Sequence, residues 1–226
     1  MKKYMKWLPI AVCIPLTFFF PELFGSRGYY LAAFTFCLLA LGSVFASFEN
    51  SSTNPLKLSV IAVLCALAIA GRAVFAGVPG VKPVAAVVII TGVSLGAQAG
   101  FMTGAVTMLV SNFMFGQGPW TVWQMLAFGV CGMLAGVVFH RREKIKQPVY
   151  MAAFGFCEYM LITGPVLDLS GIFAYTMPGK VSLAATLLAG IPVNLTAAVS
   201  TAVFIMALAN PIMKKLDRLI IKYGLE

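Results

Sequence analysis

Neutral amide side chains gather in one short stretch of an otherwise apolar chain, SNFMFGQGPWTVWQM, at residues 111–125. Asn112, Gln117 and Gln124 can each donate and accept hydrogen bonds. Trp120 offers a flat apolar ring that can cover a small organic ligand. Amides beside an aromatic ring suit a ligand that itself carries amide groups. We therefore predict that this stretch forms one wall of a ligand site.

A second interpretation of the same stretch remains open. Tryptophan is common at the membrane–water interface, where it anchors helix ends, and Trp123 fits this role better than Trp120. Gly118 and Pro119 explain the turn of the chain. We count Gly118 with the predicted wall, because the turn that it forms carries the amides.

Charged groups within the apolar runs are few, so each one is a candidate for function. Glu158 lies in the middle of AAFGFCEYMLITG, where a carboxylate is costly unless it is paired or faces a polar cavity. Arg72 is its obvious counterpart in charge. Asp168 and Tyr175 lie near a later loop, where they can contact a ligand. A structural ion pair between Arg72 and Glu158 and a binding role for both remain open alternatives.

No catalytic or metal-binding motif accompanies these residues. His140 is the only histidine, and a lone histidine cannot build a histidine-based metal site. None of the five cysteines has CxxC spacing. The chain has no GxSxG, no paired-carboxylate motif and no phosphate-binding GxxxxGK[ST]. We therefore expect no catalytic residues, no metal, no cofactor and no ATPase activity of its own.

The composition is that of a membrane protein. Hydrophobic residues make up 61% of the 226 residues and charged residues only 10%, whereas globular domains have about 25% charged residues. The net charge of +9 does not indicate nucleic acid, because most of the Lys and Arg lie in short segments between apolar runs. The predicted environment is the lipid bilayer.

The apolar runs have the lengths of transmembrane helices, which need about 20 residues to cross a core of about 30 Å. They cover residues 7–24, 29–48, 57–76, 83–97, 99–115, 121–140, 148–166 and 181–209. The run at 83–97 is short, and the last run contains Pro192, which we expect to kink it. The sequence thus predicts an all-α integral membrane protein with about eight transmembrane helices.

The distribution of charge predicts the orientation. If both termini are cytoplasmic, only Arg27, Lys82 and Lys180 fall outside, and Arg72 lies near the outer end of its span. The other Lys and Arg then lie inside: Lys2, Lys3, Lys6, Lys57, Arg141, Arg142, Lys144, Lys146, Lys214, Lys215, Arg218 and Lys222. We therefore predict a multi-pass protein of the cell membrane with both termini in the cytoplasm.

Three ordered features resemble one known family. An alanine-striped span ends in GRAVFAGVPGVKPV, then comes VVIITGVSLGAQAGFMTGAVTMLVSN, and then FGQGPWTVWQM. This order resembles the substrate-binding (S) subunits of energy-coupling factor (ECF) vitamin transporters. The resemblance covers residues 57–210, which hold six spans, the usual number in that family. Residues 1–50 add a two-helix N-terminal extension, and residues 211–226 form a basic cytoplasmic tail.

The resemblance implies a mechanism and partners. S subunits bind a vitamin or precursor at their outer face, and a separate membrane coupling subunit and two ATPases drive transport. ATP is thus used by the partners. An AxxxA face meets the coupling subunit; Ala62 and Ala66 match it and Ala70 extends it. Because small residues every four positions also allow close helix packing, an internal packing role for this alanine face (Ala62, Ala66 and Ala70) remains open.

The GQGPWT loop resembles members linked to corrinoid uptake, so cobalamin or another corrinoid is the expected ligand. Riboflavin, thiamine, pantothenate and a nucleobase-like precursor remain alternatives. A different class of function also remains open, namely an integral membrane scaffold or assembly protein without a small ligand. Binding to a panel of vitamins separates the two classes.

Overall fold

The computed structural model describes residues 55–118, 120–175 and 183–224, together with seven positions between Thr35 and Ala46. The side chains of residues 172–175 and 183 are not described. Throughout the described part the regular structure is helical and no strand is present, which confirms the predicted all-α class.

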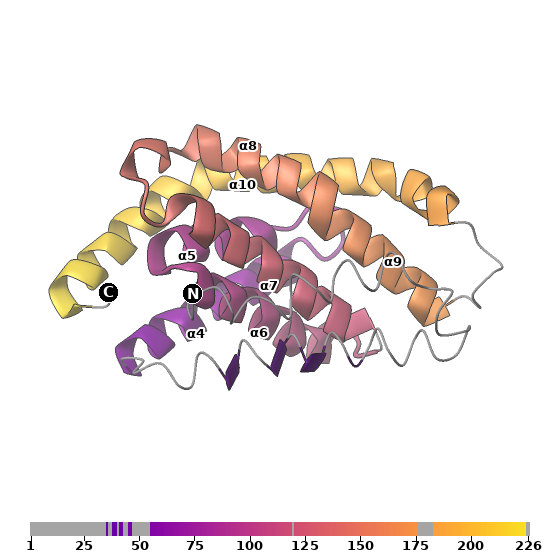
Figure 1. Cartoon of the computed structure of the whole chain (residues 1–226), viewed down its shortest axis with the longest axis horizontal. Helices are drawn as coiled ribbons and strands as arrows, with labels where there is room; N and C mark the ends of the chain where they lie inside the picture. Colours follow the sequence, from indigo (N-terminus) through magenta and orange to yellow (C-terminus); the bar gives the residue numbers. More distant parts are fainter. Residues whose placement is uncertain are drawn as a thin grey trace, which may run out of the picture.

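From Pro55 onwards the described elements form six helical rods. Figure 1 shows how these rods lie in the bundle. One of these rods is composite, because α8, a π-helical turn (η3) and α9 follow one another without a break. The elements are α4 (Pro55–Val74), α5 (Val84–Leu95), α6 (Ala97–Phe115), α7 (Trp120–Phe139), the 3-10 turn η2 (Glu143–Ile145), α8 (Pro148–Glu158), η3 (Tyr159–Thr163), α9 (Gly164–Tyr175) and α10 (Leu183–Tyr223).

The two short predicted runs at 83–97 and 99–115 are separate helices. Gly96 alone joins α5 to α6, with a φ of 94° that favours glycine. Gly116 ends α6 in the same way, with a φ of 104°. At the end of α7 the Nδ1 atom of His140 lies 3.0 Å from the carbonyl oxygen of Val93, so His140 contacts the last turn of α5.

The centre of the bundle consists of α5, α6 and α7, and every residue of α5 is buried. These helices pack closely because glycines line their contacts. A Cβ added at Gly132 would overlap the carbonyl oxygen of Gly100, and one added at Gly104 would overlap that of Phe128. Backbone lies against backbone at these points, so this glycine contact has no space for a side chain.

Four described helices are long and apolar enough to cross a membrane: Pro55–Val74, Trp120–Phe139, Pro148–Gly171 and Ala184–Tyr223. They support a multi-pass membrane protein, although fewer helices qualify than the eight predicted. The helix α5 has 12 residues and is about 18 Å long, which is less than a bilayer core. The first two predicted spans, at 7–24 and 29–48, lie largely outside the described residues.

The last predicted run does not stop at residue 209. The helix α10 has 41 residues and contains Pro192 and Pro211, yet it runs unbroken to Tyr223. Its length is about 60 Å, twice the thickness of a bilayer core. Leu216, which is 4% exposed, packs the basic tail against the bundle.

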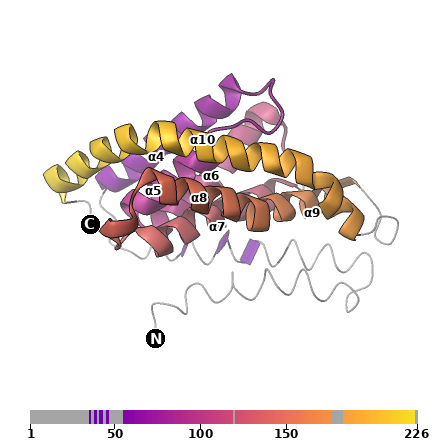
Figure 2. The same cartoon turned by 90° about the horizontal axis from the view of Figure 1, so that it is seen from above.

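The two ends of the bundle differ in chemistry. One end of the bundle, at the right of Figure 1, holds residues 75–83, residues 116–118 and the end of α9. The other end holds residues 140–147 and the C-terminus. The turned view of Figure 2 agrees with this arrangement. We call these the loop end and the basic end. Their cytoplasmic or outer placement stays a prediction.

Candidate functional site

Arg72, in the last turn of α4, holds the end of α6 through two polar side chains. Its Nη1 atom donates hydrogen bonds to Ser111 Oγ and, at 2.9 Å, to Asn112 Oδ1. Its guanidinium also stacks 4.8 Å from the ring centroid of Phe115. The cation is therefore engaged within the loop end and forms no ion pair with Glu158.

The amides of the SNFMFGQGPWTVWQM stretch bind one another. The Asn112 Nδ2 atom donates to Gln124 Oε1 at 2.7 Å and to Thr121 Oγ1 at 3.0 Å. Thr121 in turn donates to Gln117 Oε1 at 2.9 Å, and Gln117 Nε2 donates to the carbonyl oxygen of Leu109 at 2.9 Å. This amide network joins α4, α6 and α7, so the hydrogen bonds that we expected a ligand to receive are made inside the protein.

The aromatic side chains of the stretch are also packed internally. Trp123 is 5% exposed, so its ring packs inside the protein, which disfavours the alternative that it anchors a membrane interface. Trp120 is partly exposed. A Cβ at Gly118 would overlap the Trp120 ring, so glycine is needed for the ring to lie on the turn. Pro119 lies outside the described residues.

A cavity of about 210 Å³ lies among α5, the loop before it, α7, the composite rod and α10. Of the predicted site residues, Asp168 alone lines it. The lining residues are Gly80, Lys82, Val84, Ala85, Phe128, Tyr159, Leu167, Asp168, Val193, Asn194, Ala197 and Thr201. Tyr159 and Asn194 were not among the predicted site residues, although each is a polar group within an apolar run. Lys82 was used only to predict the topology.

Asp168 and Asn194 form the polar contact of the cavity. The Asn194 Nδ2 atom donates to Asp168 Oδ2 at 2.7 Å, which links α9 to α10. Two glycines allow this approach: a Cβ at Gly190 would overlap the Asp168 carboxylate, and one at Gly164 would lie 2.6 Å from Asn194 Cγ. Among the described residues no donor contacts the second carboxylate oxygen of Asp168, which can accept a hydrogen bond from a ligand.

Lys82 adds a cation to the same cavity. Its backbone N–H donates to Ser200 Oγ at 3.1 Å, which fixes the loop that follows α4 to α10. Although the residue as a whole is exposed, partial desolvation of its ammonium group lowers the pKa of Lys82, and the positive charge of Arg72 lowers it further. The cavity thus offers a cationic donor, a carboxylate acceptor and an amide.

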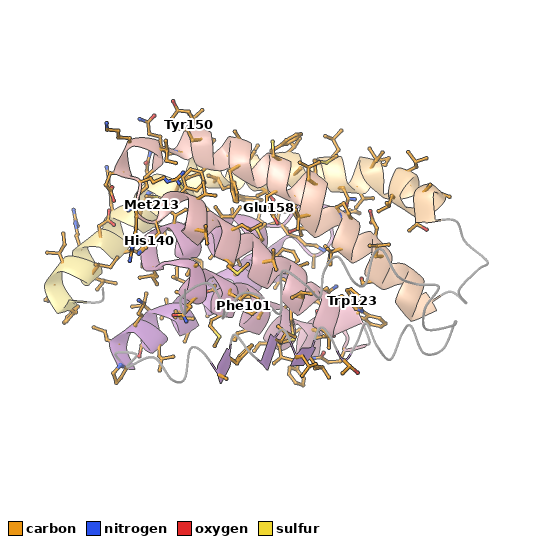
Figure 3. All side chains as sticks on the ribbon, viewed as in Figure 1. Phe101, Trp123, His140, Tyr150, Glu158 and Met213 are labelled. Carbon is orange, nitrogen blue, oxygen red and sulfur yellow. The ribbon has the colours of Figure 1, made fainter. Side chains whose placement is uncertain are left out.

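Glu158 is the last residue of α8 and directly precedes Tyr159, but it does not line the cavity itself. It is 4% exposed, and both of its carboxylate oxygens accept hydrogen bonds from Thr163 Oγ1, at 2.8 and 3.1 Å. Figure 3 shows its label at the middle of the bundle. Tyr175 ends α9 near the loop end, but its side chain is outside the described set.

The three alanines of the alanine face lie on the exposed face of α4. Leu64, Cys65 and Ala68 occupy the opposite, buried face of the helix. Within the described residues the alanines therefore do not serve internal helix packing, and they remain available to a partner.

Comparison with known proteins adds one match. The family model described as "ECF-type riboflavin transporter, S component" matches residues 52–214, which is well over half of the chain. No curated protein and no solved structure matches the chain significantly. The matched range includes all six described rods up to the tail of α10.

Proposed function

The chain belongs to the family of ECF-type riboflavin transporter S components, and from this premise we propose that the cavity lined by Lys82, Asp168 and Asn194 binds its vitamin. Family membership confirms the resemblance to S subunits, which are transporter subunits rather than enzymes and work with a membrane coupling subunit and ATPases. The match names riboflavin and not a corrinoid, so the corrinoid expectation is not confirmed.

We propose riboflavin, or a vitamin with a similar ring system, as the ligand. The cavity of about 210 Å³ is smaller than the range of roughly 300–1,000 Å³ usual for drug-sized ligands, which disfavours a corrinoid macrocycle. Phe128 and Tyr159, with ring centroids 6.5 Å apart and an interplanar angle of 72°, provide aromatic surface for a flat ring.

The polar groups of the cavity complement the dione edge of such a ring. That edge presents an imide N–H between two carbonyl oxygens. Asp168 can accept from the N–H, and Lys82 or Asn194 can donate to a carbonyl oxygen. With one cation and one carboxylate, the lining of the cavity has no net charge, which suits a neutral vitamin. The presence of Lys82, Asp168 and Asn194 in the lining of one cavity is the observation that carries the proposal.

Titration of the purified chain with vitamins tests the proposal. We expect riboflavin to bind with submicromolar affinity and its fluorescence to be quenched, because an enclosed aromatic cavity stacks on the flavin ring. Cobalamin, cobinamide, thiamine and pantothenate are titrated in parallel by calorimetry. Binding of a corrinoid without riboflavin would restore the corrinoid expectation. Binding of no vitamin in the panel would favour the scaffold alternative.

The alanine face gives a second prediction. Changing Ala62→Trp together with Ala66→Trp should abolish vitamin uptake by cells that contain the whole transporter, because bulky rings hold a partner helix away. Vitamin binding by the purified variant should remain within about 2-fold of wild type, a change below 1 kcal/mol. Val137→Trp on α7, a position that is 63% exposed, is the control and should leave uptake intact. Unchanged uptake by the double variant would show that this face docks nothing.

A further inference from the structure

The composite rod changes its helical geometry at one place. Residues Tyr159–Thr163 form a π-helical turn between α8 and α9, inside the Pro148–Gly171 span. A π-turn bonds residue i to i+5 instead of i+4 and so accommodates one extra residue. Such turns are rare, and they are frequent at functional sites.

Two buried side chains bridge this turn. Glu158 and Thr163 are five residues apart, the same spacing as the hydrogen bonds of a π-helix. Their contact joins the hydroxyl of Thr163 to both carboxylate oxygens of Glu158. Burying a carboxylate this deep in an apolar span costs free energy unless it is hydrogen bonded. This cost indicates that the bridge between Glu158 and Thr163 has a function.

The extra residue decides which side chains face the cavity. Tyr159 and Asp168 are nine residues apart. In a regular α-helix, at about 100° per residue, they would point to opposite sides of the rod. One extra residue reduces the angle between them by about 100°, so that both can face the same side. Both line the cavity.

We propose that the Glu158–Thr163 bridge is a positioning device, which holds the π-turn and thereby keeps Asp168 turned into the ligand cavity. Glu158 and Thr163 act through the rotation of α9 and not by touching the ligand. The identity of the ligand rests on the function proposed above, whereas the rotation of α9 does not.

Vitamin affinity is the first test. Thr163→Val keeps the shape of the side chain but removes the hydroxyl, and it should weaken riboflavin binding at least 10-fold. Thr163→Ser keeps the hydroxyl, and Glu158→Gln keeps an acceptor for it; both should stay within about 3-fold of wild type, a change below 1 kcal/mol. In the wild-type background Asp168→Asn should weaken riboflavin binding. In a chain that already carries Thr163→Val, the same change should weaken riboflavin binding no further. Additive losses in the double variant would overturn the proposal.

Chemical labelling tests the rotation without any ligand. In an Asp168→Cys chain a water-soluble maleimide should label residue 168 through the cavity, and adding Thr163→Val or Thr163→Ala should slow that labelling at least 5-fold. Peptide mass spectrometry distinguishes residue 168 from the native cysteines. If the Thr163 variants are labelled more slowly but the wild type binds no vitamin, the positioning device is supported and the proposed ligand is refuted. Unchanged labelling in a folded variant would refute the positioning device itself.

Discussion

Replacing Gly132 on α7 by alanine is expected to lower the free energy of unfolding of the protein strongly. A Cβ at this position would overlap the backbone of Gly100 on α6 and lie 2.7 Å from Cγ1 of Val88 on α5. Backbone cannot move aside as a flexible side chain does, so we expect a cost of about 3 kcal/mol, at the upper end of overpacking effects. Thermal unfolding in detergent should show a Tm lower by about 10 °C.

Gly171→Ala is the matched control for this change. Gly171 also lies in a helix, α9, but a Cβ there meets nothing within 4 Å. Alanine is favoured over glycine in a helix by about 1 kcal/mol, so the control variant should be as stable as wild type or slightly more stable. Equal Tm values for Gly132→Ala and Gly171→Ala would mean that α5, α6 and α7 do not pack as closely as the structure has them.

The Asp168→Ala variant is expected to lose roughly 10- to 100-fold in vitamin affinity. A hydrogen bond to a charged group contributes about 1.5–3 kcal/mol, and 1.4 kcal/mol corresponds to a factor of ten. The change also removes the acceptor of the Asn194 amide, which then lacks its partner in the cavity. The riboflavin titration described above measures the loss, with the Tm as a check on folding.

Asp217→Ala provides the comparison for this loss. Asp217 is exposed on the basic tail of α10, far along the helix from the cavity, so its removal should leave affinity unchanged. If Asp168→Ala bound the vitamin as tightly as wild type, the cavity would not be the site. The amide network around Asn112 would then become the next region to test.

The hydrogen-bond partners within the amide network could not be predicted from the sequence. The polar residues of SNFMFGQGPWTVWQM were selected because amides beside an aromatic ring can bind a ligand, and a role in ligand binding stays a prediction. Within the protein their hydrogen-bond partners are Arg72, Thr121 and one another. Local spacing shows that Asn112 requires hydrogen bonds, but only the approach of α4 to α6 supplies Arg72 as its donor.

The two acidic residues chosen from the sequence lie in different surroundings in the structure. Glu158 and Asp168 were selected because carboxylates are costly inside a membrane. The ion pair between Glu158 and Arg72 remained an open alternative, and the structure gives Glu158 a hydroxyl partner five residues away instead. Charge alone suggests a partner of opposite sign, whereas the π-turn makes Thr163 the nearest donor.

The sequence by itself determined the class of this protein. Apolar runs of transmembrane length, the low content of charged residues and the order of motifs from Gly71 to Met125 were sufficient for an all-α membrane protein of the S-subunit family. These properties depend on residues close together in the chain, whose hydropathy and spacing can be read directly.

Only the tertiary structure decided where the cavity lies and which groups face it. Lys82, Asp168 and Asn194 are far apart in the chain, and they meet because α5, α9 and α10 pack at the loop end. The π-turn at Tyr159–Thr163 then sets the rotation of α9, and one extra residue is enough to move a side chain by about 100° around a helix. Helix rotation and contact between distant segments depend on packing and not on local pattern, so hydropathy and spacing did not predict them.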